Sequence, residues 1–157
     1  VPAFWRLHLV HHLDTELDVS TTVRFHPLEF AIGLLPGLPL VIAFGMPPWV
    51  LLLYELFDAG ITLFSHANIR LSSRLDRSLR YLVVTPDLHR VHHSSHRPET
   101  NSNYSAVFPI WDLIFGTFRT RAQQEQMELG LAEVRDQRAD RLSWLLVSPL
   151  LSRLQRD

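Results

Sequence analysis

The sequence predicts an all-α protein in which an integral membrane helical hairpin carries a cytosolic, histidine-rich helical cap. Three observations lead to this fold class. Residues 30–54 contain no formally charged side chain, and apolar character resumes over residues 57–64. Seven of the nine histidines fall in two H-x-x-H-H boxes and at one position between them. Four arginines follow the second apolar segment, and by the positive-inside tendency they place that side in the cytoplasm.

The composition narrows the class of protein further. A length of 157 residues suits one domain. The net charge is −1 and no basic patch is interleaved with aromatic residues, so we expect no nucleic-acid partner. The sequence has no cysteine, which excludes disulfides, thiolate metal sites and cysteine nucleophiles.

The first fifteen residues are expected to form the end of a helix that carries the first box, His8, His11 and His12. On a helix, positions i, i+3 and i+4 fall on one face. Each box is therefore expected to project three imidazoles into one small volume. Acidic and small polar residues over residues 14–20 predict a loop outside the bilayer.

The hairpin is predicted from two apolar segments, residues 28–44 and 47–64. Each is close to the lower end of the roughly 17–25 residues that a membrane-spanning helix needs. Pro36 and Pro39 are expected to kink the first segment. A buried helical hairpin in the core of a soluble protein is the alternative to two membrane spans.

A hairpin returns the chain to the side from which it started. It would therefore bring the first box together with His66, at the end of the second segment, and with the second box, His89, His92 and His93. Glu55 and Asp58 interrupt the second span, and carboxylates at that depth are expected to face the protein interior or water.

Clustered imidazoles predict a metal site, because imidazole is the commonest protein ligand for iron, zinc, copper and nickel. A surface helix with a few histidines would explain one box, whereas two identical boxes favour metal binding. Seven histidines exceed the three or four protein ligands of a tetrahedral zinc. The count therefore predicts two metal ions.

The remaining features are less specific. His26 precedes Pro27 and could be a supporting hydrogen-bond partner, a ligand or a helix-capping residue. Residues 111–119 predict a strand or a short helix closed by Gly116. Its aromatic side chains Trp111, Phe115 and Phe118 could pack beneath the site or at the membrane interface, but plain core packing is the favoured prediction for each. We divide the chain into residues 1–122 and a polar segment with a short amphipathic tail, residues 123–157.

Five motifs in series, HLVHH, RFHPLE, HANIR, TPDLHRVHHSSHRPETNSNY and WDLIFGTF, resemble the fatty acid hydroxylase / sterol desaturase superfamily of integral membrane proteins. The resemblance covers residues 5–119. It implies a di-iron site in a cytosolic cap, with zinc able to replace iron in purified protein. It also implies that dioxygen and an external redox partner of the cytochrome or ferredoxin type are used to hydroxylate or desaturate a sterol or fatty acyl lipid. A bacterial inner membrane is the expected location.

The resemblance assigns roles position by position. Its metal ligands fall on His8, His11, His12, His66, His89, His92 and His93. Supporting positions fall on Asn68, Arg90, Asn103, Tyr104, Asp14, Asp18 and Arg24, and we place His26 with them from its own sequence context. No catalytic side chain beyond the ligands is implied. The family also has an earlier H-x(3,4)-H box, which this sequence lacks, so we expect a fragment of a longer protein or a degenerate form.

Two other functions compete with the oxygenase. A zinc hydrolase would need a carboxylate general base beside a three-histidine site, and the candidates Asp14 and Asp87 belong to no hydrolase motif. A non-catalytic, metal-binding membrane remnant would account for the missing box. The oxygenase remains the leading prediction.

Overall fold

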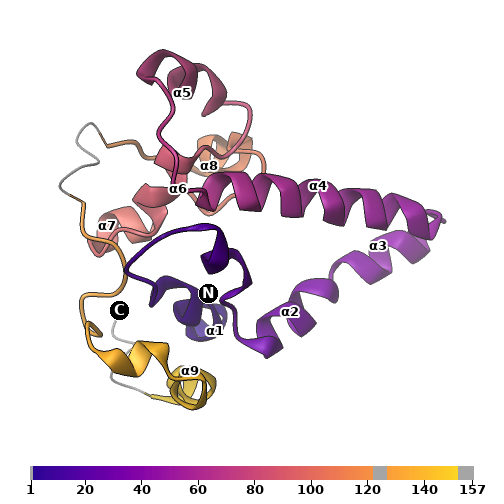
Figure 1. The fold of residues 1–157 in the computed structure, drawn as a ribbon. Coiled ribbons are helices and arrows are strands. Elements are labelled where there is room, and N and C mark those ends of the chain that lie inside the picture. The colour runs from indigo at the N-terminus through magenta and orange to yellow at the C-terminus, as the bar shows by residue number, and fades with distance from the viewer. Residues whose placement is uncertain (1, 122–126, 152–157) are drawn as a thin grey trace.

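The computed structural model describes residues 2–121 and 127–151, and its regular elements are all helical (Figure 1). One isolated antiparallel bridge joins Ser94 to Leu129. The all-α prediction is confirmed for these residues. The elements are α1 (Pro2–His12), η1 (Val19–Val23), α2 (Pro27–Leu34), α3 (Gly37–Ala43), α4 (Pro48–His66), α5 (Ser73–Leu79), α6 (Pro86–His92), α7 (Arg97–Thr100), α8 (Ile110–Phe115), η3 (Gln137–Asp140), α9 (Leu142–Val147) and η4 (Ser148–Leu150).

The two apolar segments form an arm that projects from the rest of the molecule. Figure 1 shows α2 and α3 along one side of the arm and α4 along the other, meeting at its far end. The first segment is broken between α2 and α3, where Pro36 is the N-cap of α3. Pro39 lies in the first turn of α3, where its missing N–H is no loss. The predicted kink is thus a break between two short helices.

Among the described residues, α4 is the one helix whose length and composition would let it cross a membrane. The opposite side of the arm is apolar but consists of shorter helices. Large apolar side chains on both sides lack a protein covering; Ile42 is 79% exposed and Leu56 is 60% exposed. The structure therefore supports one candidate span.

The body of the molecule is built on α1. The buried Leu9 and Val10 of α1, with Leu13 directly after it, pack against Leu131 and Val134 from the chain after residue 127. Burial of such side chains stabilises each by roughly 1.5–3 kcal/mol, so the C-terminal region holds α1 in place. The predicted division between residues 122 and 123 lies outside the described residues.

The second box is fixed by the start of α6. The Thr85 hydroxyl lies 3.3 Å from the backbone nitrogen of Leu88, caps the helix, and donates a 2.6 Å hydrogen bond to Asp76. Asp76 is buried and also forms an ion pair with Arg80. Pro86 follows the cap, at a position where proline favours the start of a helix.

Residues 110–115 form a short helix, α8, and Gly116 ends it in the left-handed conformation with φ of 70°. The buried Asp112 carboxylate accepts hydrogen bonds from the backbone N–H groups of Tyr104 and Ser105. The predicted core packing is wrong for Trp111 and Phe115, which are 58% and 74% exposed.

Candidate metal centre

The structure gathers all seven predicted ligands into two adjoining groups. His11, His66, His89 and His93, all buried, form the four-histidine cluster. His8, His12 and His92 form the three-histidine cluster. Within each cluster the ring nitrogens offered as ligands lie within 4.8 Å of one another.

Each box contributes to both clusters, contrary to the prediction that a box would fill one volume. In the first box, His8 and His12 join the three-histidine cluster, whereas His11 turns to the four-histidine cluster. In the second box, His89 and His93 share a cluster and His92 joins the other. The i and i+4 residues thus stay together, and the i+3 residue crosses to the neighbouring group.

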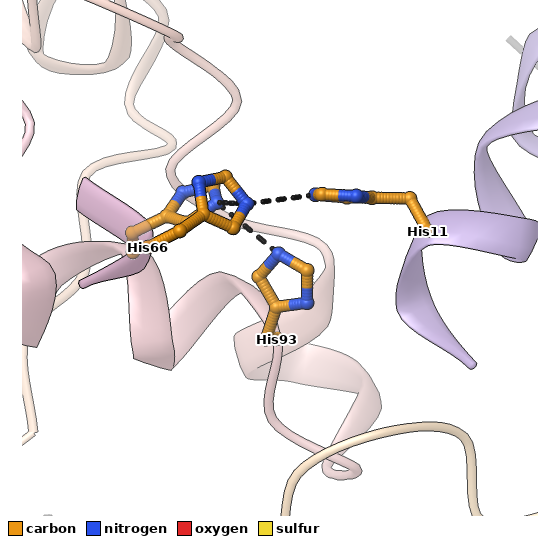
Figure 2. Close-up of side chains that lie close together, drawn as sticks. His11, His66 and His93 are labelled. Atoms are coloured by element: carbon orange, nitrogen blue, oxygen red, sulfur yellow. Dashed lines mark hydrogen bonds between the residues drawn. The ribbon is translucent and has the colours of Figure 1, made fainter. Parts of the chain in front are cut away.

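The four-histidine cluster is a chain of close nitrogen contacts (Figure 2). The Nε2 atom of His66 lies 3.0 Å from the Nε2 atoms of both His11 and His89. The Nε2 atom of His93 lies 3.1 Å from that of His89. Helix α1, the end of α4 and the end of α6 therefore meet at one point.

Backbone carbonyls fix the protonation of two of these rings. The Nδ1–H of His11 donates to the Thr21 carbonyl at 3.1 Å, and the Nδ1–H of His66 donates to the Thr62 carbonyl at 2.8 Å. In a neutral ring the proton on Nδ1 leaves a lone pair on Nε2. Two lone pairs therefore face each other across 3.0 Å. A metal cation, which binds imidazole nitrogen at about 2.0–2.1 Å, satisfies both.

The three-histidine cluster is oriented in the same way. The Nδ1–H of His92 donates to the Ser102 carbonyl at 2.8 Å, and its Nε2 lies 3.1 Å from the Nε2 of His12. His8 Nδ1 lies 2.7 Å from the Glu29 carboxylate. Hydrogen bonds from the second ring nitrogen to a carbonyl or carboxylate are the usual support of metal-bound histidine. The residues therefore fit a metal ion at each cluster.

The surroundings keep these rings neutral. Burial is the main cause that lowers the pKa of His92 to about 4, and the nearby His8 adds to the shift. Burial, followed by repulsion from neighbouring histidines, also holds the pKa values of His11, His12, His89 and His93 well below the usual 6.5. Neutral imidazole is the form that binds metal.

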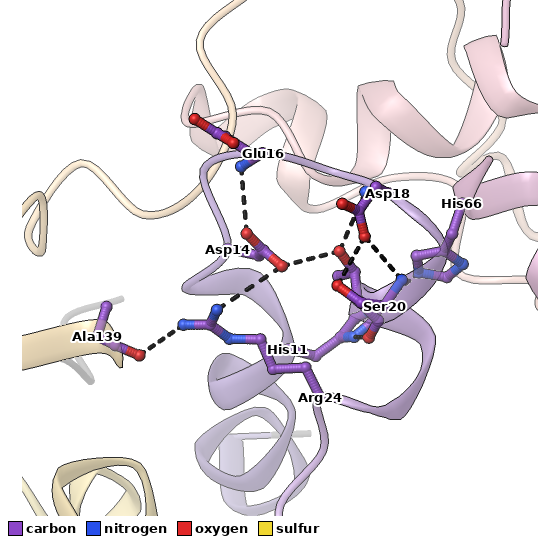
Figure 3. A network of polar contacts seen from close by, with 9 residues as sticks. His11, Asp14, Glu16, Asp18, Ser20, Arg24, His66 and Ala139 are labelled. Atoms are coloured by element: carbon purple, nitrogen blue, oxygen red, sulfur yellow. Dashed lines mark hydrogen bonds and ion pairs between the residues drawn. The ribbon is translucent and has the colours of Figure 1, made fainter. Parts of the chain in front are cut away.

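Three of the predicted supporting residues hold the carbonyl that orients His11 (Figure 3). Asp14 accepts a 2.8 Å hydrogen bond from the Thr21 hydroxyl, and Asp18 caps η1, the helix that contains Thr21. Arg24 lies 3.7 Å from Asp14 and donates a 2.6 Å hydrogen bond to the Ala139 carbonyl. The network links His11 to the C-terminal region.

The other predicted supporting residues lie in different places. His26 caps α2 by accepting from the Leu28 N–H at 3.2 Å. Arg90 donates to Asn68 at 2.8 Å on the exposed side. Asn103 is buried and donates to the Leu88 and Arg119 carbonyls. The Tyr104 ring centre lies 5.9 Å from that of His92, so Tyr104 borders the cluster.

The sequence interpretation missed partners that the structure reveals. Glu29 is part of the RFHPLE motif and is the acidic residue directly before the uncharged stretch, a signal that could have identified it. Phe25 stacks on His11 with ring centres 4.2 Å apart. The orienting carbonyls of Thr21, Thr62 and Ser102 could not have been identified from the sequence, because any residue type carries a backbone carbonyl.

A cavity of about 470 Å³ opens onto the clusters. Five histidines form part of its wall, and Phe25, Phe30 and Leu63 add apolar surface. A second, mainly apolar hollow of about 700 Å³ lies between the two sides of the arm. Glu55 borders both spaces, so they adjoin each other.

Comparison with known proteins gives a consistent match. A sequence model of the fatty acid hydroxylase family matches residues 1–117. The chain is 32% identical to the ornithine lipid hydroxylase OlsE of Rhizobium tropici, over 82% of this chain and 38% of that protein. It is also 32% identical to the human alkylglycerol monooxygenase, over 83% of this chain and 28% of that protein. The chain thus spans well under half the length of these relatives. No solved structure matches it.

Proposed function

The chain belongs to the fatty acid hydroxylase family, and we propose that it forms the metal-binding part of a membrane-bound di-iron oxygenase. The reaction is hydroxylation of a carbon–hydrogen bond in a lipid of the sterol or fatty acyl type. The observation that carries the proposal is the pair of interlocked histidine clusters at the wall of an apolar cavity. Two of its relatives are an ornithine lipid hydroxylase and an alkylglycerol monooxygenase, which favours hydroxylation over desaturation.

We assign one iron ion to each cluster, with the six boxed histidines and His66 as ligands, and zinc as a substitute in purified protein. When bound, the metals supply activation of dioxygen, which no acidic, basic or nucleophilic side chain can provide for an unreactive carbon–hydrogen bond. The carbonyls of Thr21, Thr62 and Ser102 and the Glu29 carboxylate aim the ring nitrogens at the ions. The supporting residues Asp14, Asp18 and Arg24 act through Thr21.

The two adjoining hollows supply a route for the lipid. A hydrocarbon chain lies in the apolar hollow between the sides of the arm and ends in the cavity beside His8, His11 and His92. Phe25 and Phe30 keep water from the reacting carbon. The substrate therefore enters from the bilayer between α2 and α4.

We also assign the side of the membrane on which the metal site lies and the source of the electrons. Arg70, Arg74 and Arg77 follow α4 and favour the cytoplasmic face of the membrane, in a bacterium the inner membrane. The sequence has no cysteine to hold an iron–sulfur cluster. Hydroxylation with dioxygen also consumes two electrons, which we assign to an external partner of the cytochrome or ferredoxin type.

The test is lipid analysis by mass spectrometry of cells that express the full-length protein under heavy-isotope dioxygen. We expect a lipid that gains one heavy oxygen atom in the wild type and in the His96→Ala control, but not in the His92→Ala, His93→Ala double variant. His96 is an exposed histidine outside both clusters. A lipid that loses two hydrogens without gaining oxygen would indicate desaturation instead. No lipid change in metal-loaded wild type would favour the non-catalytic remnant.

A further inference from the structure

Helix α8 presents an apolar surface that no described part of the chain covers. Five of its six side chains are large, apolar and at least 42% exposed; they are Ile110, Trp111, Leu113, Ile114 and Phe115. The sixth, Asp112, is buried and holds the loop before the helix. Contiguous apolar patches of this kind mark protein or membrane contact sites.

The position of α8 beside the candidate span, α4, favours lipid as the contact of its apolar surface. Phe108, just before α8, packs its ring against Phe57 of α4 with ring centres 5.9 Å apart. Phe57 lies roughly two and a half turns before the end of α4 at His66. Figure 1 shows α8 close to the base of α4. The apolar surface of α8 therefore continues the exposed apolar surface of α4.

The segment that contains α5 and Tyr81 carries the residue types that are enriched where a membrane meets water. Arg74 and Arg77 of α5 are exposed, and the acidic residue of that helix, Asp76, is buried and paired with Arg80. Tyr81 is 53% exposed and stacks on Phe118 just after α8, with ring centres 5.4 Å apart. Aromatic side chains with arginines beside them are enriched at membrane interfaces, and cations attract anionic lipids.

We propose that α8 and Phe108 form an interfacial anchor that inserts into an anionic lipid surface beside α4. The anchor is rigidly joined to the cavity, because Asp112 binds the backbone of Tyr104 and Ser105, and both residues border the cavity. Its depth in the bilayer therefore sets the height at which the cavity meets the lipid. The anchor is independent of metal chemistry and goes beyond the oxygenase proposal.

The test uses site-directed labelling; these 157 residues contain no cysteine, and any cysteine elsewhere in the full-length protein is first replaced by serine. Ile114→Cys introduces a single nitroxide label on the proposed anchor, and Glu128→Cys introduces a control label on a side chain that is 79% exposed. The full-length protein is placed in vesicles of phosphatidylcholine with phosphatidylglycerol. We expect the label at residue 114 to be shielded from a water-soluble paramagnetic agent and accessible to oxygen, and the label at residue 128 to behave oppositely.

Two results would overturn the anchor. One is equal accessibility of both labels to the water-soluble agent. The other is strong coupling between labels at residue 114 of two copies, which would make the surface a protein interface.

Native Trp111 gives a second measurement that needs no label. The difference in fluorescence between the wild type and Trp111→Phe gives the contribution of Trp111. We expect brominated lipids to quench this contribution, and failure to quench it would contradict the anchor. None of these readouts depends on bound metal or turnover, so failure here leaves the oxygenase proposal intact.

Discussion

His11 and His66 face each other with bare Nε2 atoms 3.0 Å apart, although 55 residues separate them in the sequence. Each ring is held by a hydrogen bond from Nδ1–H to a backbone carbonyl, so neither Nε2 can be a donor while the rings are neutral. His11 comes from α1 and His66 from the end of α4. A metal between them would join the body of the protein to its projecting arm.

Metal removal should therefore lower stability. We expect chelation to reduce the thermal unfolding temperature, because a ligand present at a hundred times its dissociation constant stabilises the folded state by about 2.7 kcal/mol. Circular dichroism of detergent-purified protein, before and after dialysis against a chelator, measures the change. An unfolding temperature that chelator leaves unchanged, in protein shown to have lost its metal, would contradict the link.

Glu29 should support the three-histidine cluster through His8. We expect Glu29→Gln to weaken metal binding there by about 10–100-fold, the usual loss when such a hydrogen-bonded carboxylate is removed. Competition with a coloured chelator measures the affinity. The control is Glu16→Gln, since Glu16 is an exposed carboxylate whose side chain lies outside both clusters. Equal affinities in the two variants would refute the role of Glu29.

The metal-free protein should become less stable as the pH falls. The folded-state pKa values of the buried histidines lie below the unfolded value of 6.5, and that of His92 is about 4. Between these values the unfolded chain binds more protons, so the free energy of unfolding falls as pH decreases, by about 1.4 kcal/mol per pH unit for each such histidine. Denaturant titrations between pH 7 and 4 measure the slope. A flat profile would mean that the rings titrate with the same pKa values in the folded and the unfolded state, and would contradict the prediction.

Gly130 should be intolerant of a side chain. Its φ is +85°, and a Cβ atom would lie 3.0 Å from Thr15 and 3.1 Å from the Asp14 carbonyl oxygen. Its N–H donates to the His93 carbonyl at 3.0 Å. We expect Gly130→Ala to destabilise the protein by about 1–3 kcal/mol. Gly60→Ala is the control, because nothing lies within 4 Å of its added Cβ. Thermal unfolding compares the two, and equal effects would contradict the prediction.

The sequence was sufficient to identify the helices that bear the boxes and the residues that gather at the centre. The spacing of His8, His11 and His12 marks one helix face, and the apolar segments show that the chain turns back. The splitting of each box between two clusters was not predictable. It depends on how α1 and α6 are positioned against each other, which is a tertiary relationship without a local sequence signal.

Two further features could not be predicted from the sequence, for physical reasons. Aromatic residues in a short apolar run look the same whether they face a core or a lipid, so the exposure of Trp111 and Phe115 could not be read from residues 111–119. The break at Pro36 was visible as a proline, but its consequence, two short helices in place of one kinked span, depends on the local packing of the arm.

The most direct test of the two-cluster account is elemental analysis of iron and zinc in the purified full-length protein and two single variants. We expect about two metal ions per wild-type chain, and about one in His66→Ala, which disrupts the four-histidine cluster, and in His12→Ala, which disrupts the other. Metal-edge X-ray absorption should report nitrogen ligands in all three. A folded wild type with no stoichiometric metal, or variants that keep both ions, would contradict the account.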